Sequence, residues 1–159
     1  MCNVFSIEVL QDLIRQSPES WHPLVFTNGC FDILHVGHVR YLTAAKQLGK
    51  TLVVGLNSDR SVRQLKGDRR PIVPEAQRAE VIAALKPVDA VVIFSETTAI
   101  ATIAAIAPDI YVKGGDYAPE ALPEAPTVLA YGGRIELIQV EIPTSTSAIV
   151  QRILDSYSV

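Results

Sequence analysis

Two histidines lie three positions apart in a segment whose residue types suit the binding of a phosphate. The segment reads Thr27-Asn28-Gly29-Cys30-Phe31-Asp32-Ile33-Leu34-His35-Val36-Gly37-His38. An apolar run, Leu24 to Phe26, precedes it, and a helix is predicted from Val36 to Leu48, so the segment joins a strand to a helix N-terminus. Such a terminus offers unpaired N–H groups and a positive dipole end to a phosphate, and Gly37 leaves space for a close approach. The pattern predicts nucleotidyl transfer, in which fixed donors stabilise charge developing at an α-phosphate.

Histidines in such a segment can also have structural or metal-binding roles. A single histidine at such a place more commonly caps the helix or packs beside it, but a His-x-Gly-His pattern at a strand-to-helix turn favours phosphate chemistry. A zinc site needs further ligands, and no other His, Cys, Asp or Glu lies at a suitable spacing from His35 and His38. No metal site made of protein side chains is therefore predicted. Asp32 either caps the helix or orients a histidine, and it is also a candidate for contact with a phosphate or substrate.

Positive charge is concentrated in the middle of the chain. Six of the 14 Lys and Arg residues fall within one short stretch: Arg60, Arg63, Lys66, Arg69, Arg70 and Arg78. For Arg60 and Arg63, a solvated helix face is the plainer interpretation. Arg78, in the next predicted helix, is expected to face the phosphates of a ligand.

Two further polar segments follow predicted strands. Gly114 and Gly115 allow a close backbone approach, and the carboxylate of Asp116 can accept from a base, a ribose or a sugar hydroxyl. An ordinary turn accounts for the glycines equally well. The range Ser145 to Ser147 opens the last predicted helix, where hydroxyls are ordinary N-caps. Because this helix also follows a strand, the same hydroxyls can hold the β- and γ-phosphates of a nucleotide.

The elements that would position these segments alternate between strands and helices. Five short apolar strands are predicted, at 24–26, 51–56, 90–94, 110–112 and 135–140. Helices are predicted at 7–16, 36–48, 59–65, 75–85, 98–107 and 146–157, with a short one before Gly132. Apolar strands separated by helices predict a parallel sheet covered on both faces, which binds ligands at the carboxyl ends of its strands. The expected fold is therefore α/β, a Rossmann-like three-layer sandwich with a five-stranded parallel sheet.

Length and composition describe an ordinary globular domain covering residues 1–159, with 48% hydrophobic residues. A formal net charge of -3 and a pI of about 5.6 argue against non-specific nucleic-acid binding, which needs a basic surface. No segment reaches the ~20 apolar residues of a membrane span, and the first residues lack the pattern of a signal peptide. A cytoplasmic protein is therefore expected, with Cys2 and Cys30 as free thiols.

The histidine segment resembles the cytidylyltransferase-like nucleotidyltransferases, in which the pattern Gly-x-Phe-Asp-x-x-His-x-Gly-His marks the nucleotide site. The matching residues are Gly29, Phe31, Asp32, His35, Gly37 and His38. Dinucleotide-binding Rossmann proteins match less well, because no G-x-G-x-x-G follows the first strand. Three further segments, 66–71, 112–117 and 132–133, are similar to the heptose-1-phosphate adenylyltransferase branch. The resemblance covers about 24–153.

This resemblance implies an enzyme that joins ATP to a sugar 1-phosphate, glycero-manno-heptose 1-phosphate in particular, and releases pyrophosphate. It implies that His35 and His38 contact the α-phosphate and that a mobile loop brings Lys66 onto the donor and acceptor phosphates. The residues implied in nucleotide binding are Asn28, Gly29, Cys30, Phe31, Gly37, Gly114, Gly115, Asp116, Ser145, Thr146 and Ser147.

The resemblance also implies partners and leaves alternatives. Mg²⁺ is expected on the triphosphate, a homodimer is one expected state, and a chain of 159 residues leads us to expect a separate upstream sugar kinase. The Arg-Thr-Glu-Gly lead-in of the glycerol-phosphate enzymes is missing, and Ala148 stands where relatives often have a polar residue. A cytidylyltransferase acting on glycerol 3-phosphate or a related alcohol phosphate is the alternative enzyme. A non-catalytic nucleotide-binding domain is the alternative of another class.

Overall fold

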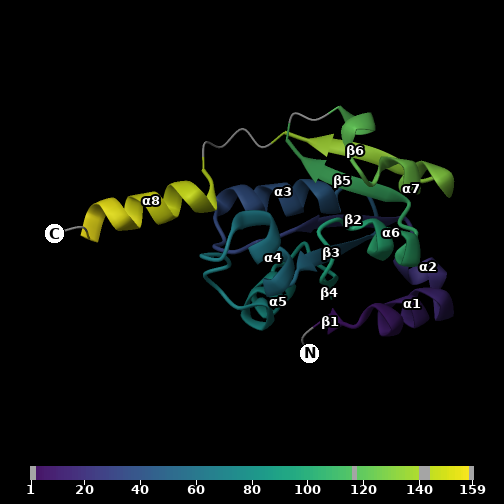
Figure 1. Ribbon diagram of the computed structural model, residues 1–159. Helices are drawn as coiled ribbons and strands as arrows, with labels where there is room; N and C mark the ends of the chain where they lie inside the picture. The colour runs from purple at the N-terminus through teal and green to yellow at the C-terminus, as the bar shows by residue number, and fades with distance from the viewer. Residues whose placement is uncertain (1–2, 116–117, 140–143, 158–159) are drawn as a thin grey trace.

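A six-stranded parallel sheet forms the centre of the computed structural model, which describes residues 3–115, 118–139 and 144–157 (Figure 1). The strands are β1 Val4–Phe5, β2 Leu24–Gly29, β3 Thr51–Asn57, β4 Ala90–Phe94, β5 Ile110–Gly114 and β6 Arg134–Ile138, in the order β1-β4-β3-β2-β5-β6. The predicted parallel α/β sheet is confirmed, but the predicted number of strands, five, is wrong. The strand that was missed, β1, pairs Val4 with Val91 at the sheet edge and is too short to show an apolar pattern.

The helices confirm the predicted alternation and correct some boundaries. They are α1 Ile7–Gln16, α2 Pro18–Trp21, α3 Val36–Lys46, α4 Asp59–Lys66, α5 Glu75–Ala83, α6 Ile100–Ile106, α7 Ala125–Ala130 and α8 Thr146–Tyr157, with a 3-10 turn η1 at Pro119–Ala121. The first helix begins where the Ser6 hydroxyl accepts a hydrogen bond from the Val9 N–H. One expected turn, 27–29, continues strand β2 instead, because Asn28 pairs with Gly55 and Gly29 with Leu56 of β3.

Two apolar layers, one on each face of the sheet, hold the helices in place. On one face, Phe26 and Tyr111 pack in a cluster with residues of α1, α6 and α7. On the other face, Val25 and Val112 pack with residues of α3 and α5. Strands buried on both faces explain why the sequence shows continuous apolar runs rather than an alternation of apolar and polar residues.

Strand β2 lies at the point where the direction of the sheet order reverses. The chain runs from β2 to β3 on one side, and β5 later pairs with the opposite side of β2. Open parallel sheets bind ligands outside the carboxyl ends of the strands at such a point. Residues 28–29 end β2 and residues 113–114 end β5, so two of the polar segments singled out in the sequence meet here.

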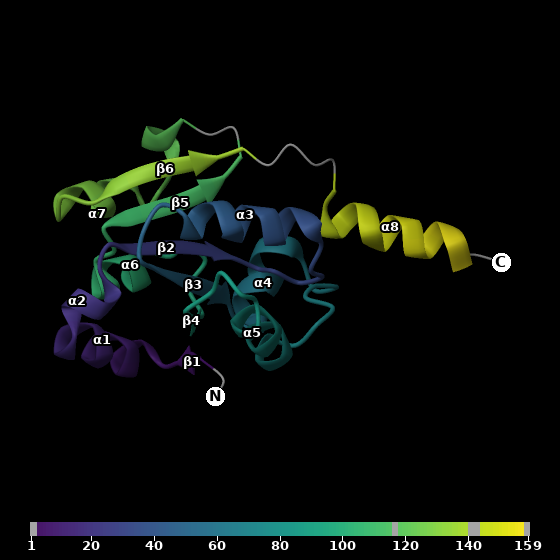
Figure 2. The same cartoon turned by 180° about the vertical axis from the view of Figure 1, so that it is seen from behind.

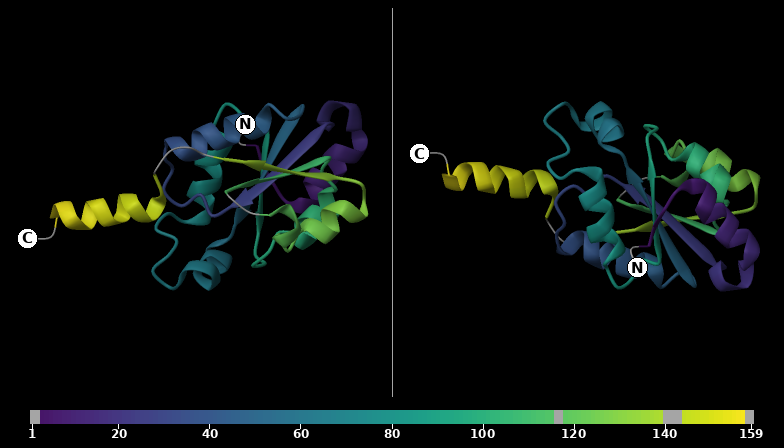
Figure 3. Two further views of the ribbon diagram at one scale, coloured as in Figure 1. Left: turned by 90° about the horizontal axis from the view of Figure 1, so that it is seen from above. Right: turned by 90° about the horizontal axis from the view of Figure 1, so that it is seen from below.

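The last helix, α8, projects from the body of the molecule in every view (Figures 1, 2 and 3). None of its residues is buried. Its first turn nevertheless contacts the loop between β2 and α3, where the Thr146 hydroxyl donates to the Ile33 carbonyl at 3.3 Å. Among the described residues, no helix is both long and apolar enough to cross a membrane.

Candidate functional site

Two stacked imidazoles stand at the N-terminus of α3. His35 is the N-cap residue, and the His38 N–H donates to the His35 carbonyl at 3.0 Å. The ring centroids are 3.8 Å apart and the ring planes are inclined by 24°. A Cβ at Gly37 would lie 2.9 Å from the His35 Nδ1, so a glycine is required here to seat the histidine pair. Gly37 was expected to leave space for a phosphate beside the backbone. In the structure it also leaves space for the His35 imidazole.

Burial favours the neutral form of both imidazoles. Desolvation lowers the pKa of His35, and desolvation together with the nearby His35 lowers the pKa of His38 to about 4. The buried Nδ1 atoms of both rings have no hydrogen-bond partner among the described residues. A neutral imidazole donates through only one nitrogen, and an Nε2–H tautomer would aim that donor away from the buried Nδ1. The pair can therefore donate to a phosphate without bringing two cations into contact.

Phe31 separates the histidine pair from the core below. Its ring is buried and meets the His38 ring edge-on, with centroids 5.2 Å apart. The same ring lies over Gly29, where a Cβ would come within 2.9 Å of it. The backbone of Phe31 has a φ of 43°, a left-handed conformation that is strained for a bulky residue. The local turn is thus built so that an aromatic ring supports His38.

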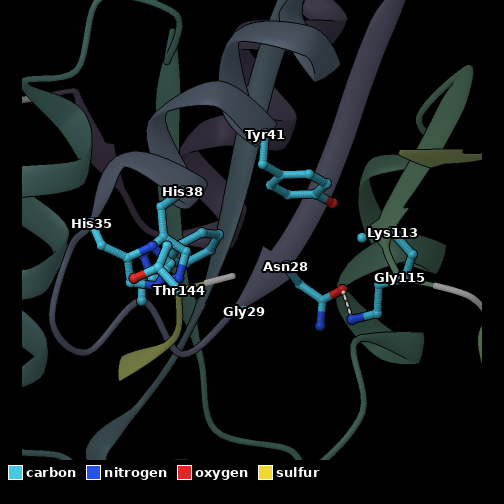
Figure 4. A pocket seen from close by; sticks show the side chains of 11 residues that line it. Asn28, Gly29, His35, His38, Tyr41, Lys113, Gly115 and Thr144 are labelled. Atoms are coloured by element: carbon cyan, nitrogen blue, oxygen red, sulfur yellow. Dashed lines mark hydrogen bonds between the residues drawn. The ribbon is translucent and has the colours of Figure 1, made fainter. Parts of the chain in front are cut away.

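A first pocket of about 410 Å³ opens between the ends of β2 and β5 (Figure 4). Its lining residues are Asn28, Gly29, Phe31, His35, Gly37, His38, Tyr41, Lys113, Gly114, Gly115 and Thr144. Tyr41 anchors its floor, since the phenol bonds the Thr27 hydroxyl at 2.6 Å and donates to the Val112 carbonyl at 3.1 Å. The first pocket thus joins the histidine turn to the glycine-rich end of β5.

One wall of the first pocket is a network centred on Asn28. The Tyr111 hydroxyl and the Lys113 ammonium both donate to Asn28 Oδ1, each at 2.9 Å. An ammonium can only donate, so the atom facing it must be the amide oxygen, and the orientation of the carboxamide is fixed. Figure 4 shows this contact as a dashed line, with the Asn28 amide nitrogen turned away from Lys113.

A second pocket of about 220 Å³ carries cations and hydroxyls. Its lining residues are Cys30, Phe31, Asp32, His38, Val62, Lys66, Arg70, Ser145, Thr146 and Ser147. Lys66 ends α4, and the Ser145 hydroxyl caps α8 by accepting from the Ala148 N–H at 3.1 Å. Two pocket walls, Phe31 and His38, are shared with the first pocket. An extended polyanion can therefore lie across both pockets over the histidine pair.

Asp32 holds the loop that follows α4 against the histidine turn. Its Oδ1 accepts from the backbone N–H groups of Ile72 at 2.8 Å and Val73 at 2.9 Å, and its Oδ2 pairs with Arg70 Nε at 3.3 Å. Of the two expected structural roles, capping the helix and orienting a histidine, neither appears among its hydrogen bonds to the described residues. Asp32 is 6% exposed, and its carboxylate instead fixes the position of the loop that carries Arg70.

Arg78 was expected to face phosphates, but it lines neither the first nor the second pocket. The residue is 2% exposed, and its guanidinium donates to the carbonyls of Val73 and Cys30 and to the Asp59 carboxylate. All of its nitrogens thus have partners within the protein. Arg78 ties α5 and α4 to the turn at Cys30, a structural role that the charge pattern of the sequence did not reveal.

The structure brings most of the predicted site residues into the two pockets. Asp116 lies outside the described residues. Sequence reasoning missed Tyr41, Lys113 and Arg70 as lining residues, together with Thr144 and Val62. Lys113 and Arg70 each lay inside a segment that was singled out, so the positive charge beside paired glycines and beside Lys66 was the available signal.

Comparison with known proteins agrees with this geometry. The sequence pattern of the cytidylyltransferase-like family matches residues 26–152. The chain belongs to the cytidylyltransferase-like family. Membership confirms the resemblance carried by the His-x-Gly-His segment. The matched range includes the lining residues of both pockets and strands β3 to β6.

Relatives within the cytidylyltransferase-like group are close in sequence. A protein of Syntrophotalea carbinolica named Bifunctional protein HldE is 51% identical over 94% of this chain and 31% of its own length. The protein of the same name from Citrifermentans bemidjiense is 51% identical over 96% of this chain and 31% of its length. The chain thus spans about a third of the length of these relatives.

One solved structure is similar to this chain in both sequence and fold. The lipopolysaccharide core biosynthesis protein of Thermoplasma volcanium is 32% identical to this chain, with a TM-score of 0.60. The match covers 76% of this chain and 97% of that protein. The cytidylyltransferase-like chain therefore has a relative of nearly matching extent among proteins of known structure.

Proposed function

We propose that this domain transfers the adenylyl group of ATP to a sugar 1-phosphate, glycero-manno-heptose 1-phosphate in particular, and releases pyrophosphate. The observation that carries this proposal is the stacked pair His35 and His38 at the N-terminus of α3, set between the cationic second pocket and the glycine-edged first pocket. Membership of the cytidylyltransferase-like family supports the reaction class. Two relatives named Bifunctional protein HldE and one named for lipopolysaccharide core biosynthesis support a sugar phosphate as acceptor.

In this reaction, an acceptor phosphate oxygen forms a bond to the α-phosphorus while the bond to the bridging β-oxygen breaks. Pyrophosphate leaves with the electron pair. The N–H groups at the start of α3 and the donors of His35 and His38 stabilise the charge that develops on the α-phosphate. The acceptor is already an anion near neutral pH, so alignment rather than a strong general base is what the site supplies.

We assign the departing pyrophosphate to the second pocket. Lys66 and Arg70 supply positive charge there, and the hydroxyls of 145–147 supply hydrogen bonds at the N-terminus of α8. Lys66 is exposed at the end of its helix, so it can follow the charge from the bound triphosphate to the product. The first pocket suits a triphosphate less well, because Lys113 is the sole Lys or Arg among its described lining residues.

Mg²⁺ would be carried mainly by the phosphates of the nucleotide. Among the described residues, no group of three or more His, Cys, Asp and Glu side chains could hold a metal ion, and the Asp32 carboxylate already accepts two backbone hydrogen bonds. Mg²⁺ commonly keeps several waters and binds through substrate phosphates, where it neutralises their charge. The acceptor itself must come from a reaction that phosphorylates a sugar at its anomeric carbon, and we propose a sugar kinase for that step.

Turnover assays test the reaction and its alternatives together. The protein would be incubated with ATP or CTP and with heptose 1-phosphate or glycerol 3-phosphate, and both pyrophosphate and the nucleotide product would be measured. ADP-heptose formed with ATP supports the proposal. Product with CTP and glycerol 3-phosphate alone would establish the alternative, a cytidylyltransferase. Nucleotide binding without turnover on any pair would indicate a non-catalytic domain.

A further inference from the structure

Lys113 supplies the positive charge of the first pocket. The lysine lies in β5, beside Gly114, and its ammonium is within 2.9 Å of Asn28 Oδ1 and 5.9 Å from the centroid of the Tyr111 ring. The two cations of the second pocket, Lys66 and Arg70, lie beyond the shared wall of Phe31 and His38. Cations are therefore divided between the two sides of the histidine pair.

The ammonium of Lys113 is held in place by Asn28 and lies in direct contact with no carboxylate among the described residues. Among the ion pairs of residues 3–115, 118–139 and 144–157, none includes Lys113. Burial lowers the pKa of Lys113, and the more distant Glu124 carboxylate and Cys30 offset this lowering only in part. A charged group in this state gains most from an anion that enters the pocket.

Asn28 fixes where this charge is presented. Its Oδ1 accepts a hydrogen bond from one of the three N–H groups of the Lys113 ammonium. The Tyr111 hydroxyl donates to the same oxygen and so keeps the carboxamide from turning. The contact joins positions 85 residues apart and crosses from β2 to β5. The other two N–H groups of the ammonium can donate hydrogen bonds to a ligand in the first pocket.

The geometry of attack on the α-phosphate indicates which anionic group enters the first pocket. In an in-line displacement, the attacking oxygen enters on the side opposite the leaving group. If pyrophosphate leaves through the second pocket, the acceptor phosphate must approach the α-phosphate from the first. We propose that Lys113 binds the phosphate of the acceptor and that Asn28 is the positioning residue that aims it, an inference that rests on the proposed nucleotidyl transfer. The nucleoside itself is neutral and does not need a buried cation.

Steady-state kinetics of Lys113→Met test this assignment. The acceptor would be whichever of heptose 1-phosphate and glycerol 3-phosphate supports pyrophosphate release by the unaltered protein. The KM for this acceptor should rise about tenfold to a hundredfold, as for loss of a charge-assisted contact, and the KM for the nucleotide should stay within about twofold. Lys86→Met, on an exposed lysine remote from both pockets, is the matched control and should change neither KM.

A second variant, Asn28→Asp, keeps the lysine and tests the same idea without removing volume. A carboxylate beside the ammonium would compete with the acceptor phosphate, so the acceptor KM should again rise while thermal unfolding shows a folded protein. This variant decides the matter if Lys113→Met does not fold. An unchanged acceptor KM in the folded variants, or a rise in the nucleotide KM alone, overturns the assignment.

The failure of the proposed function has a different signature. Turnover of glycerol 3-phosphate with CTP would refute the adenylyl proposal but leave Lys113 testable on that acceptor. Absence of pyrophosphate release by the unaltered protein with every pair would overturn both.

Discussion

The imidazole of His35 stacks on that of His38 with 3.8 Å between the ring centroids, and neither buried Nδ1 has a hydrogen-bond partner among the described residues. Two rings in this arrangement cannot both be charged without strong repulsion, and burial disfavours even one charge. Below neutral pH, these two imidazoles therefore bind protons less readily in the folded protein than in the unfolded chain.

The stability of the protein should accordingly decrease as the pH falls. The pKa of His38 is lowered from 6.5 to about 4, so between these values the unfolded state binds more protons than the folded state. The free energy of unfolding should rise with pH through this window and level off above it. Urea unfolding at pH 7, 6 and 5 measures the slope, which should be shallower in His38→Asn. Equal slopes in the two proteins would contradict the assignment.

Replacement of Gly37 by alanine should impair turnover rather than folding. The new Cβ would lie 2.9 Å from His35 Nδ1 and 3.4 Å from Thr144 Cγ2, so the imidazole must move. A displacement of this kind can cost roughly a hundredfold in kcat, whereas alanine within a helix is favoured over glycine by about 1 kcal/mol. Measurement of kcat beside thermal unfolding separates the effects. Val39→Ala, on the exposed side of the same helix, is the control, and a kcat for Gly37→Ala equal to that of the control would refute the steric argument.

Asp32→Asn should loosen the loop that carries the cations of the second pocket. The asparagine oxygen is a weaker acceptor for the N–H groups of Ile72 and Val73 and gives no ion pair with Arg70. We expect a loss of about 1–3 kcal/mol in the free energy of unfolding and faster proteolysis within 67–73. The neighbouring carboxylate Asp68 is exposed, so Asp68→Asn should leave both measurements unchanged. Equal protease sensitivity of the two variants would speak against a positioning role for Asp32.

Arg78→Lys distinguishes a structural arginine from one that contacts phosphate. A lysine keeps the charge but cannot reach the carbonyls of Val73 and Cys30 and the Asp59 carboxylate together. Denaturant unfolding should show a loss of about 2 kcal/mol or more, while the KM for nucleotide stays within about twofold at a temperature where the variant is folded. Arg63→Lys, on an exposed arginine, should alter neither. A large rise in KM with unchanged stability would restore the phosphate role.

Local signals in the sequence were sufficient for most of the fold. The bounds predicted for the first and last helices, Ile7–Gln16 and Thr146–Tyr157, agree with the structure, because helical periodicity depends on residues close in the chain. The two-residue strand β1 was missed, since its pairing with β4 joins residues 87 positions apart, such as Val4 and Val91. Such a strand exists because of its neighbour and not because of its own pattern.

The candidate site shows the same division. The histidine turn could be predicted because the residues it needs are consecutive. The partners of Asp32 lie 40 and 41 positions away, and the contact between Lys113 and Asn28 spans 85. These contacts form only when the strands assemble in their final order, and no single segment of the sequence contains that information. Charge alone misled for Arg78, whose partners arise from the packing of α5 against the turn.

The conformation of Phe31 has a consequence for the evolution of this domain. A left-handed backbone at a bulky residue costs about 1–3 kcal/mol, so the strand-to-helix turn is one place where stability could be increased by substitution. Glycine would relieve the backbone, yet it would remove the ring on which His38 rests. Selection for heat resistance and selection for turnover therefore act in opposite directions at this residue, and thermostable descendants must gain their stability elsewhere in the fold.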